Sequence, residues 1–215
     1  METKSNYDKY LLFFKSKLGR KSFVVTKGEG SVMVSAPHSA EQTRAGRTKF
    51  AEYETGAIAC TLHDRTGCPV ICKTKHCHDD ANRDEKCRYK AQLKKYVLKN
   101  GIKYLLDIHQ MNTQREEQIC LGTGRGENVK ASPAVVDIAK SVFEKHGFAV
   151  SVDEPFCAVH PFTVSAFTSR ECGIACLQIE MNTKLVSKGH KECRVEDVIL
   201  ALTEIIETLI EGGAQ

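Results

Sequence analysis

The sequence predicts a three-layer α/β/α domain with a mixed, mostly parallel sheet. Short runs rich in Val, Ile and Leu alternate with longer segments whose apolar residues recur at helical spacing, which indicates helices on both faces of a sheet. Hydrophobic residues make up 41% of the chain and charged residues 27%, which are globular values. Because we find no internal repeat and no linker, we expect residues 1–215 to form one domain.

The first half of the chain is predicted to begin with an amphipathic helix and then to form short strands. A turn at Lys27–Gly30 favours a tight hairpin between the first two strands, and the polar segments Gln42–Lys49 and His76–Asp84 are expected to be loops. The regular elements expected here are a helix over Tyr7–Lys17, strands over Phe23–Thr26 and Val32–Ser35, a helix over Ala51–Asp64 and a strand over Val70–Lys73.

The second half continues the alternation of helices and strands. Tyr89, Leu93, Tyr96 and Val97 form one helical stripe, which stops at Asn100-Gly101. Two further stripes predict helices over residues 135–143 and 195–209. The strands expected in this half of the chain are Tyr104–His109, Ile119–Leu121, Phe148–Val152 and Ala175–Ile179. The stretch Asp153–Arg170 contains two prolines and is predicted to be an irregular lid or binding loop.

Composition excludes several classes of function. The net charge of +4 is spread along the chain, so we expect no nucleic-acid partner. No stretch approaches the roughly 20 apolar residues of a membrane span. The first ten residues, METKSNYDKY, lack the basic segment followed by an apolar segment that is typical of a signal peptide, so a cytoplasmic location without a membrane partner is expected. The ten cysteines are then expected to be reduced, most of them as small buried side chains.

Histidines end two of the predicted strands. His38 follows the run SVMVSAP, and His109 closes the run Leu106-Asp107-Ile108-His109. Because the carboxyl ends of parallel strands share one edge of the sheet, we expect these two histidines to meet and hold a metal. A catalytic zinc takes three protein ligands and keeps a position open. His38-x-x-Glu41 offers a third ligand from the same turn, and Glu52 and Glu54 are rivals.

Two further acids suit a hydrolytic metal site. Asp107 lies two residues before His109, so its side chain is expected on the same face, where it could orient an imidazole. Glu180 directly follows an apolar strand, and burial there would raise its pKa towards the working pH of a general base. The expected chemistry is attack of a metal-activated water on a carbonyl carbon.

Five segments in order resemble the signatures of the N-formylglutamate amidohydrolase family. They are Ser35-Ala36-Pro37-His38-Ser39, Glu52-Tyr53-Glu54-Thr55-Gly56, Asn82-Arg83-Asp84, Leu106-Asp107-Ile108-His109 and Leu177-Gln178-Ile179-Glu180-Met181-Asn182. The resemblance implies a phosphorylase/hydrolase-like fold related to zinc carboxypeptidases and hydrolysis of a linear amide on an N-formyl or N-acyl amino acid.

The resemblance also implies roles for individual residues. One zinc ion would bind His38 and His109, Glu180 would be the catalytic acid/base, and Asn82 and Arg83 would grip the substrate carboxylate, which a guanidinium group can bind bidentately. Family members carry an acid at the position of Glu52, whereas carboxypeptidase-like relatives use His-x-x-Glu. Since this sequence has both, we prefer Glu41 for its local geometry and keep Glu52 open.

Two other functions compete with an amidohydrolase. One is a carboxypeptidase-like metallopeptidase that acts on short peptides, with a pocket roofed by Asp153–Arg170. The other is a non-catalytic binding protein on the same fold, although a binding protein would have no need of Glu180 as a base.

Overall fold

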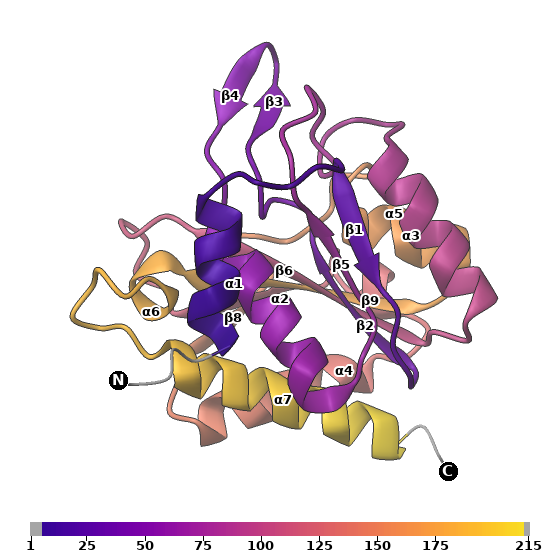
Figure 1. The fold of residues 1–215 in the computed structure, drawn as a ribbon. Coiled ribbons are helices and arrows are strands. Elements are labelled where there is room, and N and C mark those ends of the chain that lie inside the picture. Colours follow the sequence, from indigo (N-terminus) through magenta and orange to yellow (C-terminus); the bar gives the residue numbers. More distant parts are fainter. Residues whose placement is uncertain (1–5, 213–215) are drawn as a thin grey trace.

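The computed structural model describes residues 6–212 and contains a seven-stranded sheet at its centre (Figure 1). From one edge to the other, the strands are β1 (Phe23–Thr26), β5 (Val70–Lys73), β2 (Val32–Ala36), β6 (Tyr104–Met111), β9 (Ala175–Asn182), β7 (Ile119–Gly122) and β8 (Val150–Val152).

The four central strands β5, β2, β6 and β9 run parallel to one another. Strand β1 is antiparallel to β5 and β7 is antiparallel to β9, whereas β8 is parallel to β7. The sheet is therefore mixed and mostly parallel, as predicted, and the carboxyl ends of its four central strands share one edge.

Helices cover both faces of the sheet (Figure 1). One face packs against α1 (Asn6–Lys15), α2 (Tyr53–Thr66), α4 (Ala134–Lys145) and α7 (Val195–Gly212), whose apolar residues join those of the strands in the larger core. The opposite face packs against α3 (Arg88–Lys99) and α5 (Val164–Cys172) in a smaller core. Alternate residues of β6 serve the two cores: Leu106 and Ile108 point into the larger core and Leu105 into the smaller one.

The predicted hairpin between β1 and β2 does not form. Strand β5 lies between the two, and the connection runs instead along the turn after α2, where the Glu29 N–H donates to the Gly67 carbonyl (2.9 Å). The prediction of a tight hairpin turn at Lys27–Gly30 was therefore wrong: these residues form an irregular connection, and their composition carried no information on strand pairing.

The predicted loop Gln42–Lys49 is a two-stranded hairpin that projects from the domain (Figure 1). Its strands are β3 (Gln42–Arg44) and β4 (Arg47–Lys49), and they are joined by Ala45 and Gly46, whose φ angles are 50° and 75°. Positive φ at both central residues is the geometry of a two-residue hairpin turn. The hairpin was missed because its side chains are polar on both faces, so they give no hydrophobic alternation.

The predicted irregular stretch Asp153–Arg170 ends in helix rather than loop. Residues 153–163 are irregular, but α5 begins at Val164, where the Thr163 hydroxyl accepts a hydrogen bond from the Ala166 N–H (3.2 Å). A single turn, α6 (Thr183–Val186), and a 3-10 helix, η1 (Glu127–Val129), were also not predicted.

Two compositional expectations meet different outcomes. All ten cysteines are free, but only Cys68, Cys72, Cys120 and Cys176 are buried, so most are partly exposed rather than buried as expected. Within residues 6–212, no helix is long and apolar enough to cross a membrane.

Candidate metal centre

The two strand-end histidines meet at the carboxyl edge of the sheet. His38 lies in the turn after β2, where the Ser39 hydroxyl donates to the carbonyls of Ala36 (2.8 Å) and Lys73 (2.7 Å). His109 is in β6, and both imidazoles are buried, at 2% and 1% exposure. Their Nδ1 atoms are 3.2 Å apart. The prediction that two histidines 71 residues apart become neighbours is confirmed.

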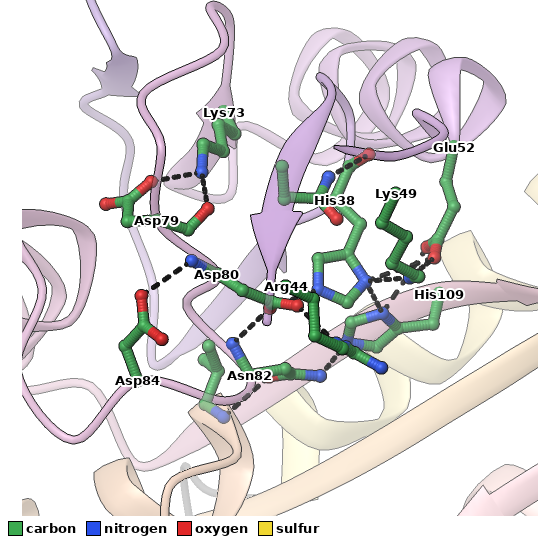
Figure 2. A network of polar contacts seen from close by, with 12 residues as sticks. His38, Arg44, Lys49, Glu52, Lys73, Asp79, Asp80, Asn82, Asp84 and His109 are labelled. Atoms are coloured by element: carbon green, nitrogen blue, oxygen red, sulfur yellow. Dashed lines mark hydrogen bonds and ion pairs between the residues drawn. The ribbon is translucent and has the colours of Figure 1, made fainter. Parts of the chain in front are cut away.

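Glu52 completes a group of three potential ligands (Figure 2). Its backbone N–H donates to the His38 carbonyl (2.8 Å), which fixes the start of α2 beside the histidine turn. Glu52 Oε1 is 3.0 Å from His38 Nδ1, and Oε2 is 3.4 Å from His109 Nδ1. One ligand atom from each of the three residues lies within 4.8 Å of the others, and all three side chains are buried.

Buried carboxylates hold the far sides of both imidazole rings. His38 Nε2 is 2.9 Å from Asp80 Oδ1, and His109 Nε2 is 3.3 Å from Asp107 Oδ2. A carboxylate at one ring nitrogen is the usual support of an imidazole that ligates a metal through its other nitrogen. Asp107 therefore lies where it was predicted, on the face of β6 that carries His109.

The site carries an excess of buried acids. Burial would raise the pKa of Glu52, but His38, Lys49 and His109 hold it well below its usual value. Burial would lower the pKa of His109, but Asp107 and Glu52 raise it well above its usual value. The Lys49 ammonium group donates to Glu52 Oε1 (2.7 Å) and to His38 Nδ1 (2.8 Å). Two of the potential metal ligands, His38 and Glu52, thus already bind one cationic group, the ammonium group of Lys49.

Glu180 lies beside this group. It is paired with His109 in the register of β9 and β6, and it is 8% exposed. Gln178 Nε2 donates to Glu180 Oε1 (3.1 Å). Burial is the largest influence on this carboxyl group and raises its pKa to about 7, although the positive charge of His109 opposes the shift. Glu180 can therefore accept or release a proton near neutral pH.

These groups open into one cavity of about 680 Å³. The hairpin contributes Arg44 and Lys49 to its wall, and the segment 155–160 lies among its other lining residues. Arg83 lines the cavity as an exposed side chain, where its guanidinium group is accessible to a ligand. A cavity of this size is ordinary for a small-molecule site.

Glu41 is not part of the ligand group. Its carboxylate accepts from Lys17 Nζ (2.7 Å), a residue just beyond α1, and its side chain is 25% exposed. Glu54 lines the cavity but lies 3.7 Å from Lys15 Nζ rather than with the histidines. The geometry thus supports Glu52 over the preferred Glu41.

Asn82 makes contacts that its sequence position did not suggest. Its Oδ1 accepts from the Val164 N–H (2.7 Å), and its Nδ2 is 3.0 Å from His109 Nε2. Asn82 is therefore tied to a histidine and to the start of α5, while Arg83 beside it is free to face the cavity.

Two residues at the site were not predicted from the sequence. Asp80 accepts from Arg44 Nε (2.7 Å) as well as contacting His38, and these two partners hold its pKa well below the usual range against the effect of burial. Lys49 lies in the segment expected to be a loop. The only sequence signal for Asp80 was its place two residues before Asn82 in a polar segment.

The residues present fit a divalent metal ion. Two imidazole nitrogens and a carboxylate are the donor set of a catalytic zinc site, and here one such atom from each residue lies within 4.8 Å of the others. Asp107 Oδ1 is buried without a hydrogen-bond partner, so negative charge at the site is not fully compensated by the protein. A bound dication would balance that charge.

Comparison with known proteins agrees with the resemblance seen in the sequence. Residues 88–187 match the family model described as N-formylglutamate amidohydrolase, a family of hydrolases. This range contains Asp107, His109 and Glu180, whereas His38 and Glu52 precede it. No curated protein matches the chain in sequence.

Solved structures share the fold. N-formylglutamate amidohydrolase from Ralstonia eutropha JMP134 aligns with a TM-score of 0.64 and 16% identity, over 89% of this chain and 99% of that one. A bacteriophage poly-gamma-glutamate hydrolase aligns with a TM-score of 0.57 and 14% identity, over 92% and 94% of the two chains. A metallo-carboxypeptidase from Burkholderia cenocepacia aligns with a TM-score of 0.53 and 10% identity, over 96% and 69%. The predicted carboxypeptidase-like fold is confirmed.

Proposed function

We propose that this chain is a zinc-dependent hydrolase that cleaves the linear amide bond of an N-formyl or N-acyl amino acid. The observation that carries the proposal is the convergence of His38, Glu52 and His109 beside Glu180 in the wall of one cavity. The family match over residues 88–187 supports the reaction class.

His38, Glu52 and His109 would hold one metal ion, with Asp80 and Asp107 fixing the orientation of the two imidazoles. When bound, zinc supplies Lewis acidity and lowers the pKa of a coordinated water to about 7. The chain's own residues then decide where protons go and how the substrate lies.

Glu180 is the proposed general acid/base. Its carboxyl group, with a pKa raised to about 7 by burial, can take the proton of the attacking water and pass it to the leaving nitrogen. Its hydrogen bond from Gln178 fixes one carboxyl oxygen, so the other remains available.

Arg83 is the proposed partner of the substrate carboxylate. It is an exposed arginine at the wall of the cavity, and its neighbour Asn82 is held by Val164 and His109. A guanidinium group binds a carboxylate through two parallel hydrogen bonds, which would orient the amide relative to the metal ligands.

A carboxypeptidase-like activity on short peptides is the second candidate. The volume of about 680 Å³ leaves room for more than an N-formyl amino acid, and the same ligands and base would serve. The structure from a poly-gamma-glutamate hydrolase makes γ-linked glutamyl peptides a further class to include in tests.

A substrate panel would test the proposal. Purified protein is analysed for bound metal and then assayed for release of formate or free amine from N-formyl amino acids, N-acetyl amino acids, dipeptides and γ-linked glutamyl peptides. We expect one zinc per chain, turnover of at least one N-acyl amino acid, and loss of turnover with a chelator. A protein that binds metal but hydrolyses none of these amides would refute the proposed function.

A further inference from the structure

Lys90 is a buried charge that the proposed reaction does not use. It lies in the first turn of α3, is 1% exposed, and is among the largest fully buried side chains of the described residues. Burial lowers its pKa. Removing an ammonium group from water is expensive unless it is well partnered, so its partners indicate what its position achieves.

The partners of Lys90 are two backbone carbonyls and two aromatic rings. Its Nζ donates to the carbonyl oxygens of Asp84 and Phe162, the latter at 2.8 Å. It also lies 5.1 Å from the ring centroid of Phe167 and 5.8 Å from that of Phe162. One ammonium group therefore joins two segments that are 78 residues apart in sequence.

The first joined segment is the turn Asp80–Asp84, which touches both histidines (Figure 2). Within it, the N–H groups of Arg83 and Asp84 donate to the Asp80 carbonyl, and the Asp84 carboxylate accepts from the Asp80 N–H. These hydrogen bonds hold the turn in one conformation. Lys90 binds the turn at the carbonyl oxygen of Asp84. Arg83, within this turn, is one of the residues that line the cavity.

The second joined segment is 155–163, which forms another part of the cavity wall. Phe162 immediately precedes Thr163, whose hydroxyl donates to the His160 carbonyl (3.0 Å) and whose backbone precedes α5. The position of the Phe162 carbonyl therefore sets the position of His160 and its neighbours in the cavity wall. Asn82 adds a second link, through the Val164 N–H.

We propose that Lys90 is a positioning residue for substrate binding, because its buried ammonium group holds the turn that carries Arg83 at a fixed separation from the cavity segment 155–163. The inference rests on the proposed function, in which Arg83 binds the substrate carboxylate. Without the ammonium group, the separation of the two walls would be less constrained and the carboxylate would bind more weakly. Asp80 would still be held by Arg44 (2.7 Å), so the support of His38 would remain.

The test compares Lys90→Met with Lys94→Met. Met fills most of the space of the lysine stem but has no ammonium group. Lys94 lies one turn further along α3 and binds Glu171 (2.9 Å) outside the cavity, so it is a matched control. Steady-state kinetics are measured with the best N-acyl amino acid from the panel and with the same compound as its carboxamide.

We expect Lys90→Met to raise KM for the carboxylate substrate by about ten-fold or more and to change kcat by less than about three-fold, because the loss is in binding. Selectivity for the carboxylate over the carboxamide should fall by a similar factor, while zinc content remains one per chain. Lys94→Met should match the wild type in all four quantities: KM, kcat, selectivity and zinc content.

A merely structural lysine would lower the melting temperature and leave KM and selectivity unchanged, and that result would overturn the proposal. If the wild type hydrolyses no amide, the proposed function fails together with the role of Lys90 that rests on it. If the wild type is active but Lys90→Met keeps its KM, only the role of Lys90 fails.

Hydrogen exchange of the wild type provides a second test that does not depend on the folding of a variant. If Lys90 joins the two segments, the free amino acid product should slow exchange at residues 80–84 and 160–164 by similar factors, about three-fold or more. Protection of one segment without the other would refute the coupling.

Discussion

Replacing Glu180 by Gln should inactivate the protein and at the same time stabilise it, to an extent that depends on pH. Gln keeps the shape of the side chain, and its carbonyl oxygen can still accept the hydrogen bond from Gln178. It cannot ionise. Loss of a general base lowers turnover by roughly 10²- to 10⁴-fold, and zinc should remain bound because Glu180 is outside the proposed ligand set.

The stabilisation follows from the raised pKa of Glu180. The pKa of the carboxyl group is 4.5 when exposed and about 7 in the folded chain, so between these pH values the folded state binds more protons than the unfolded state. Folding stability therefore falls as pH rises through this window, and the full penalty is present above about pH 7. The difference of about 2.5 between the two pKa values costs about 3 kcal/mol of stability at about pH 8, and the part of it present at about pH 5.5 costs about 1 kcal/mol.

Urea denaturation of chelator-treated protein would measure this effect. We expect Glu180→Gln to be more stable than the wild type by about 3 kcal/mol at about pH 8 and by about 1 kcal/mol at about pH 5.5. Glu127→Gln, at a glutamate whose side chain is 77% exposed, is the control and should show no such pH dependence. Equal stabilisation at both pH values would mean that Glu180 is not a buried acid of raised pKa, and full turnover would remove it as the base.

Three further predictions concern the ligands, their support and the substrate carboxylate. Glu52→Gln should lose most bound zinc while Glu41→Gln keeps it, as measured by metal analysis after dialysis; the reverse result would restore Glu41 as the third ligand. Asp80→Asn should weaken zinc binding by roughly 10- to 100-fold in a chelator competition, because it removes the carboxylate that orients His38, and unchanged affinity would count against that role. Arg83→Met should raise KM for carboxylate substrates and leave the carboxamide unaffected, and equal effects on both would exclude the proposed ion pair.

Most of the sheet and part of the site could be predicted because their signals are local. Val70–Lys73 was predicted with its bounds correct, and the strands that carry His109 and Glu180 differed only at their ends. Residues at strand ends converge by the geometry of parallel sheets, so His38, His109 and Glu180 could be grouped before any contact was known. Asp107 followed from the two-residue period of the same strand.

The remaining features depend on contacts between distant segments. Glu41 and Glu52 are equally plausible ligands in sequence, and the choice is made by Lys17, which pairs with Glu41, and by the start of α2, which places Glu52 beside His38. Lys90 gave no signal at all, because its partners are backbone carbonyls rather than side chains.

The hairpin β3–β4 offers a route to changing substrate range by design. Its strands pair only with each other and not with the strands of the central sheet, although the Thr43 N–H also donates to the Asp79 carbonyl (3.4 Å). Because neighbouring residues of a strand alternate in direction, lengthening both strands in steps of two would extend the rim of the cavity without reversing which side chains face inward. Chimaeras that exchange Ala45-Gly46 for longer turns would therefore change the opening of the cavity. The proposed metal ligands and Glu180 would themselves be unchanged.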